Sequence, residues 1–93
     1  MHTLEKYFPG DEKWQRFANM FDEFISKQEV QDLAKKLNGD VKLAAVIYGS
    51  VGSGCERWVA SKVPALDDIS PLECIGDPGL LNRLRTALMR MPR

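Results

Sequence analysis

Apolar residues recur at helical spacing along most of the chain. In residues 11–25 they are separated by steps of three and four, which places them on one face of an α-helix. The stripe consists of Trp14, Phe17, Phe21, Phe24 and Ile25. It predicts one amphipathic helix, and four aromatic rings on one stripe are typical of a hydrophobic core.

A second helix is predicted directly after the first. Ser26 and Glu29 match the S-x-x-E capping box, in which the two side chains satisfy backbone N–H groups at a helix start. Asn38-Gly39 predicts its end, because glycine tolerates the left-handed conformation that closes a helix. Two helices joined so tightly predict an antiparallel hairpin over residues 1–40.

Residues 41–48 are almost continuously apolar. β-Branched Val46 and Ile47 would permit a strand, but the capping residue Asp40 before the run and Gly49 after it favour a short, buried helix. Residues 49–54, with three glycines, predict a flexible joint.

The stretch from Ser53 to residue 69 predicts a short helix and a connector. Ser53 and Glu56 form a second S-x-x-E pattern that would open a helix containing Trp58. Val63-Pro64 ends that helix, because the residue before proline avoids the helical region. Residues 65–69 are expected to be extended.

Two further helix starts combine a capping residue with proline. Ser70-Pro71, with Glu73 three residues after the cap, predicts a short helix. Asp77-Pro78 predicts the last helix, whose apolar face contains Leu80, Leu81, Leu84, Ala87, Leu88 and Met91. The predicted fold is all-α: one compact domain of five to six short helices, with Trp58, Pro64, Leu66, Ser70 and Pro71 as structural anchors.

Charge is unevenly distributed along the 93 residues, although the formal net charge is zero. Residues 1–40 have a net charge of −2, as do residues 41–77. Residues 78–93 contain Arg83, Arg85, Arg90 and Arg93 and no acid. This basic C-terminal segment is either a solvated helix face or a contact surface for an acidic or phosphate-lined partner.

The chain offers little catalytic or metal-binding chemistry. Its one histidine is His2, and the spacing of Cys55 and Cys74 fits no metal motif, so no metal, no cofactor and no enzymatic activity are expected. A position near a helix N-terminus could lower the pKa of the Cys55 thiol. No apolar run is long enough for a membrane span, and we expect reduced thiols and a cytoplasmic protein without a membrane partner.

DNA binding is an alternative, because residues 31–49 place two short helices around a glycine-containing turn. The second of these helices offers only Lys42 and Tyr48 to base edges, and the N-terminal half is acidic, which opposes phosphate binding. DNA contact is therefore expected only within a larger complex or not at all. A helical dimerisation module is a third interpretation, and a homo-oligomer remains open.

Trp58, Pro64-Ala65-Leu66 and Ser70-Pro71-Leu72-Glu73, followed by an amphipathic last helix, resemble the toxin-binding domain of Xre/MbcA/ParS-type antitoxins. The order and spacing of these elements carry the resemblance, over about residues 41–91. Residues 41–93 are accordingly interpreted as an antitoxin-like toxin-binding region.

The resemblance implies an all-helical protein that binds a RES-domain toxin and neutralises it by covering its active site. Such toxins consume NAD⁺ or transfer ADP-ribose from it, and their antitoxins often dimerise. The C-terminal end of the antitoxin is expected near the toxin's cleft. Carried over to this sequence, the implied partner-binding residues are Arg85, Leu88, Met89, Arg90, Met91 and Arg93.

Overall fold

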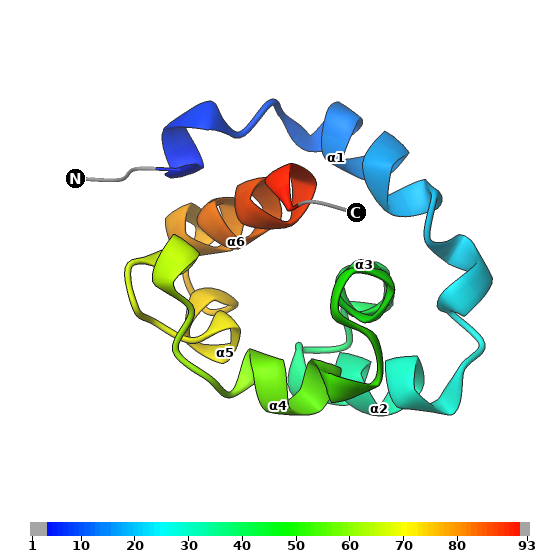
Figure 1. Ribbon diagram of the computed structural model, residues 1–93. Coiled ribbons are helices and arrows are strands. Elements are labelled where there is room, and N and C mark those ends of the chain that lie inside the picture. The colour runs from blue at the N-terminus through cyan, green and yellow to red at the C-terminus, as the bar shows by residue number, and fades with distance from the viewer. Residues whose placement is uncertain (1–3, 92–93) are drawn as a thin grey trace.

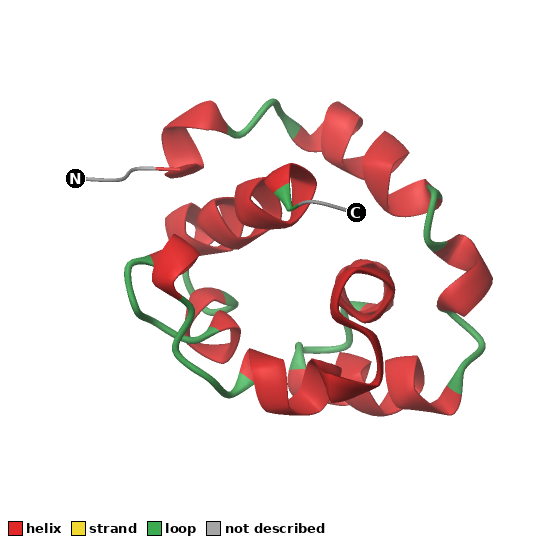
Figure 2. Ribbon diagram, viewed as in Figure 1, coloured by secondary structure: helices red, strands yellow, loops and turns green. Residues whose placement is uncertain are grey.

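Two helices, α3 (Val41–Val51) and α6 (Pro78–Arg90), occupy the middle of the molecule. In the computed structural model, which describes residues 4–91, the other elements form a ring around these two (Figure 1). The elements in this part of the chain are α-helices and short 3₁₀ turns, without a strand (Figure 2). The predicted all-α fold is therefore confirmed.

The predicted helix over residues 11–25 is broken in two. After the 3₁₀ turn η1 (Leu4–Tyr7), helix α1 covers Asp11–Asn19 and the 3₁₀ turn η2 covers Asp22–Phe24. Phe21 leaves the helical path between them, with φ −106° and ψ 8°. The aromatic stripe nevertheless stays together, because neighbouring rings from Trp14 to Phe24 lie 5.2–6.4 Å apart between centroids.

Helix α2 (Gln28–Lys36) starts and packs differently from the prediction. Lys27 occupies the N-cap position and no side chain caps the helix, so the predicted Ser26–Glu29 capping box is wrong. The predicted end is confirmed, because Asn38 and Gly39 have positive φ angles of 59° and 82°. The hairpin is not formed: η2 separates the two helices, and α1 and α2 each pack against α3 rather than pairing with each other.

Helix α3 is the most buried element. Asp40 caps it as predicted, accepting a hydrogen bond from the Leu43 N–H at 3.0 Å. All five side chains from Leu43 to Ile47 are fully buried. The helix continues through Gly49 and Ser50 to Val51, so the flexible joint predicted over residues 49–54 is wrong. The 3₁₀ turn η3 (Gly52–Gly54) then leads directly into α4 (Cys55–Val59).

The segment between α4 and α5 (Pro71–Cys74) is a closed loop rather than the predicted extended connector. Gly54 precedes α4 without a side-chain cap, so the predicted role of Ser53 is also wrong. The 3₁₀ turn η4 covers Pro64–Leu66, and Asp67 and Asp68 follow with left-handed φ angles of 61° and 63°. This reversal lets Val63 and Ile69 form an isolated antiparallel bridge.

Both cap-and-proline helix starts are confirmed. Ser70 and Glu73 form the complete capping box of α5, and Asp77 accepts hydrogen bonds from the N–H groups of Gly79 and Leu80 at the start of α6. Helix α6 buries Leu84, Thr86 and Leu88. Of the helices in residues 4–91, none is long and apolar enough to cross a membrane.

Candidate functional site

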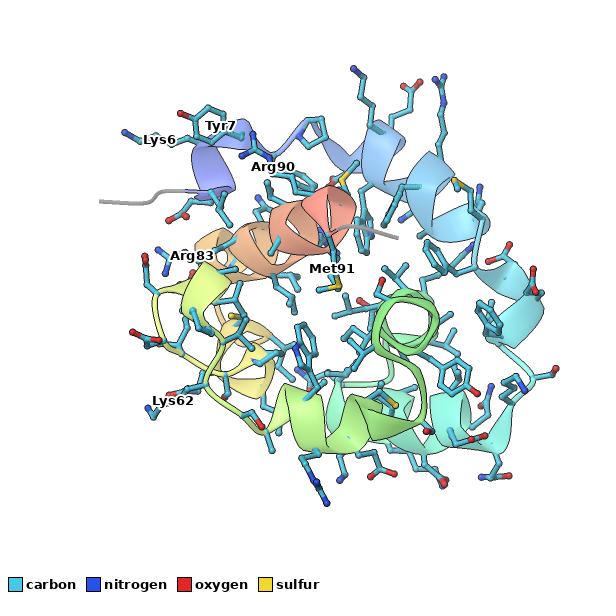
Figure 3. The ribbon with its side chains drawn as sticks, viewed as in Figure 1. Lys6, Tyr7, Lys62, Arg83, Arg90 and Met91 are labelled. Carbon is cyan, nitrogen blue, oxygen red and sulfur yellow. The ribbon has the colours of Figure 1, made fainter. Side chains whose placement is uncertain are left out.

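The N-terminal arm, defined here as residues 4–8, lies along α6 (Figure 3). Leu4 and Phe8 are partly buried there, whereas Tyr7 is exposed. Three arginines of α6 contact the arm: one forms hydrogen bonds with a carboxylate, and the other two lie over aromatic rings. The basic character of the C-terminal segment is thus largely engaged within the chain.

Arg83 joins the arm to the loop after α4. Its Nε and Nη2 donate to Oε1 and Oε2 of Glu5, each at 3.0 Å, which is a bidentate pair. Nη1 donates to the Leu66 carbonyl at 3.4 Å and lies 3.4 Å from Oδ2 of Asp67. Only 15% of the Arg83 side chain is exposed. The hydrogen bonds from Arg83 lower the pKa of the Glu5 carboxyl, and Glu5 raises the pKa of Arg83.

Arg85 is held between aromatic rings and is not a free surface cation. Its guanidinium carbon lies 5.9 Å from the ring centroid of Phe8 and 5.4 Å from that of Trp14. Nη1 is 3.7 Å from Oδ1 of Asp11, and 18% of the side chain is exposed. Its Nε is buried without a hydrogen-bond acceptor among the described residues. The structure therefore gives this predicted partner-binding residue an intramolecular packing role.

Arg90 remains available at the end of α6. Its guanidinium lies 4.9 Å from the ring centroid of Tyr7, and it has no carboxylate partner within residues 4–91. Of the other predicted contact residues, Leu88 is fully buried, whereas Met89 and Met91 are partly exposed. Arg93 lies outside the described residues. The exposed end of α6 thus offers Met89, Arg90 and Met91.

An open hollow adjoins this end of α6. It has a volume of about 310 Å³ and is formed by the arm, α4, the following loop and α6. Apart from Arg90, its lining side chains are apolar: Leu4, Trp58, Val63, Ala65, Ala87 and Met91. A second hollow of about 320 Å³ is lined by Leu4, Pro64, Ala65 and Arg90. Three residues line both hollows, so the two hollows adjoin each other; together they are here called the apolar groove.

The predicted anchors fall into two groups. Leu66 and Pro71 are buried, and Ser70, whose hydroxyl caps α5, is 7% exposed. Pro64 is exposed and starts η4, and Trp58 is only partly buried. Trp58 and Pro64 therefore belong to the lining of the apolar groove as well as to the scaffold.

Neither cysteine has the lowered thiol pKa that is typical of a reactive cysteine. Burial raises the pKa of the Cys55 thiol, in contrast to the lowering that a helix N-terminus can produce, because the side chain is enclosed by the core. Burial also raises the pKa of Cys74 to about 11. Neither forms a disulfide. Among the described residues, no cluster of three or more His, Cys, Asp or Glu side chains forms a metal-binding group.

Sequence reasoning missed several residues of the groove, namely Leu4, Val63, Ala65 and Ala87. Their sequence signals are weak, because single small or aliphatic residues do not distinguish a surface depression from a core. Val63 was recognisable only as the residue before a helix-ending proline. Their common location depends on the loop reversal at Asp67 and Asp68 and on the docking of the arm.

Comparisons with known proteins add no relative. No protein-family model matches the sequence, and comparisons with curated proteins and with solved structures likewise found no match.

Proposed function

We propose that this chain is an antitoxin-like protein that binds a RES-domain toxin and neutralises it by covering the toxin's active site. The proposal rests on the resemblance in residues 41–91 and on one structural observation. At the C-terminal end of α6, an arginine without a carboxylate partner among residues 4–91 lies beside the apolar groove. Apolar lining combined with a few placed polar groups is typical of binding sites.

The end of α6 suits a cleft that accommodates NAD⁺. A cationic side chain attracts phosphate or acidic groups, and Arg90 is exposed. Met89 and Met91 add flexible apolar surface, which adapts readily to a partner. In this proposal the chain carries no catalytic group of its own; it acts by occupying the toxin's cleft.

The helix-turn-helix alternative gains no support from the position of α3. A recognition helix must present polar side chains to the major groove, whereas five consecutive residues of α3 are fully buried. Lys42, the one cation of that helix, donates hydrogen bonds to Asn19 and Asp22. Helix α3 is the centre of a core rather than an exposed reading element.

Co-expression tests the proposal. The chain is produced together with the product of an adjacent RES-domain gene, and cell growth and complex formation are measured. We expect restored growth and a complex that purifies intact. A chain that neither binds this product nor relieves its toxicity would refute the antitoxin function, and a homodimer without toxin binding would favour the dimerisation module.

The same assay tests the C-terminal residues. Arg90→Glu combined with Arg93→Glu is expected to weaken toxin binding at least tenfold, because it reverses two positive charges at the proposed contact. Lys13→Glu combined with Lys35→Glu is the matched control, because both lysines are exposed and lie on α1 and α2. Equal affinities of the two double variants would remove the C-terminal end from the contact surface.

A further inference from the structure

We infer that the apolar groove receives a segment of the protein partner that carries an acidic side chain next to a bulky apolar one. This inference rests on the proposed function and adds to it: besides covering the toxin with its own C-terminal end, the chain accepts part of the toxin. Four features of the described residues support it.

The shape of the groove matches a peptide rather than a fully enclosed ligand. Pro64, Ala65 and Arg90 are exposed, so one side is open to solvent. The two hollows adjoin each other at Leu4, Ala65 and Arg90. A pair of adjoining hollows accommodates successive apolar side chains of one segment, whereas small-molecule sites bury most of their ligand.

Trp58 gives the groove an anchoring surface. Its ring is partly buried and lines the larger hollow. Its indole N–H has no acceptor among the described residues. Partly exposed tryptophans with a free donor are enriched at interfaces, because they combine a large apolar area with one hydrogen bond.

The charge of the groove selects for an acidic group. Arg90 is the only charged side chain that lines either hollow among the described residues. The nearby carboxylates of Glu5 and Asp67 are paired with Arg83, which leaves Asp68 as the exposed acid of the adjacent loop. An apolar occupant without a carboxylate would leave the Arg90 guanidinium beside it unpaired.

The N-terminal arm shows which type of segment α6 already binds. It presents Glu5 to Arg83, Phe8 to Arg85 and Tyr7 to Arg90. Figure 3 shows Tyr7 beside Arg90, where the contact between the arm and α6 ends. Acidic and aromatic side chains therefore pair with the arginines of α6 within the chain itself. The apolar groove adjoins this contact between the arm and α6, because Leu4 of the arm and Arg90 of α6 both line it.

Two substitutions of exposed alanines test the inference. Ala65→Glu places a negative charge between the hollows and is expected to weaken binding of the co-expressed RES-domain toxin at least tenfold. Ala60→Glu is the matched control, because Ala60 is exposed shortly before Ala65 and does not line the groove. Its affinity is expected to stay within twofold of wild type. Circular dichroism melting of both variants checks that they are folded.

A photo-crosslinking residue at position 65 gives a second readout that does not depend on a damaging substitution. Mass spectrometry of the cross-linked complex is expected to identify a toxin segment with an acidic residue beside an apolar one. Cross-links to a second copy of this chain, or to a toxin segment without an acid, would overturn the inference.

The outcomes separate the two proposals. If the wild-type chain does not bind the toxin, the proposed function fails and the inference fails with it. If the wild-type chain and folded Ala65→Glu bind equally well, the groove is not the receiving site, although the antitoxin function stands.

Discussion

Gly49 is a residue at which helix propensity and packing oppose each other. It lies inside α3, where alanine would favour the helix by about 1 kcal/mol. A Cβ atom at this position, however, would lie only 2.6 Å from Cε1 of Phe21 and 3.0 Å from Cε2 of Phe24. Phe21 is itself buried against the core, so its ring has little room to move away.

We therefore expect Gly49→Ala to destabilise the protein by about 1–3 kcal/mol, because overpacking outweighs the gain in helix propensity. Urea unfolding followed by circular dichroism measures the change. Gly54→Ala is the control: a Cβ at Gly54 meets no atom within 4 Å, so its effect should stay within about 0.5 kcal/mol. A more stable Gly49→Ala variant would show that Phe21 does not approach α3 this closely.

At the scale of the element, helix starts differ in how much they depend on the rest of the molecule. Ser70 and Asp77 cap their helices, and each is followed by a proline with a backbone angle suited to the first turn. Ser26 and Ser53 have the same S-x-x-E spacing without proline and cap nothing. A capping pattern predicted a helix start correctly at Ser70 and Asp77, where a proline follows the capping residue. It was also correct at Asp40, which directly follows the helix-ending Gly39.

This difference has a measurable consequence. Ser70→Ala should cost about 1 kcal/mol of unfolding free energy, because the Glu73 N–H loses its acceptor. Ser26→Ala and Ser53→Ala, which alter exposed serines, should each change it by less than about 0.5 kcal/mol. Thermal or urea unfolding of the three variants compares them directly. Equal losses for all three would mean that the serines act through something other than capping.

The sequence predicted the helical class and the ends set by local chemistry, but not the breaks imposed by packing. The stripe from Trp14 to Phe24 has perfect helical spacing, yet Phe21 turns off the helical path to contact Gly49. The left-handed conformations of Asp67 and Asp68 could not be predicted from the sequence either, because an Asp-Asp pair does not require them. The carbonyl of Leu66 and the carboxylate of Asp67 contact Arg83, so this loop depends on a distant helix.

For the whole molecule, the arginines of α6 decide how the two ends of the chain meet. Their sequence pattern indicated either a solvated face or a contact surface, and the structure adds a third role. Arg83 and Arg85 bind the N-terminal arm, and Arg90 lies over the Tyr7 ring without a carboxylate partner in residues 4–91. The apolar groove combines residues from four separate segments, so periodicity within any one segment could not reveal it.

The pairing of Glu5 with Arg83 predicts a dependence of stability on pH. Hydrogen bonds from Arg83 lower the pKa of Glu5 in the folded state, so the unfolded chain binds a proton more readily. The stabilisation is complete well above the ordinary glutamate pKa of about 4.3 and is lost as the pH falls through the lower pKa of the folded state.

Urea unfolding of the wild type and Glu5→Gln at several pH values between 7 and 3 measures this contribution. At pH 7 the variant should be less stable by about 1–2 kcal/mol, because a partly buried bidentate pair is lost. The two curves should converge as the pH falls. Glu12→Gln, which removes an exposed ion pair with Arg16, should cost about 0.5 kcal/mol or less. A constant difference between wild type and Glu5→Gln at all pH values would contradict the assignment.

The same pair has a consequence for the order of folding. Glu5 and Arg83 are 78 positions apart, so joining them closes a loop that contains most of the chain. The entropy lost in closing so long a loop is recovered only after the intervening helices have collapsed. Contacts between α2 and α3, which are near neighbours in sequence, carry no such penalty. We therefore expect the core around α3 to form early and the arm to dock late, so that one wall of the groove is completed only at the end of folding.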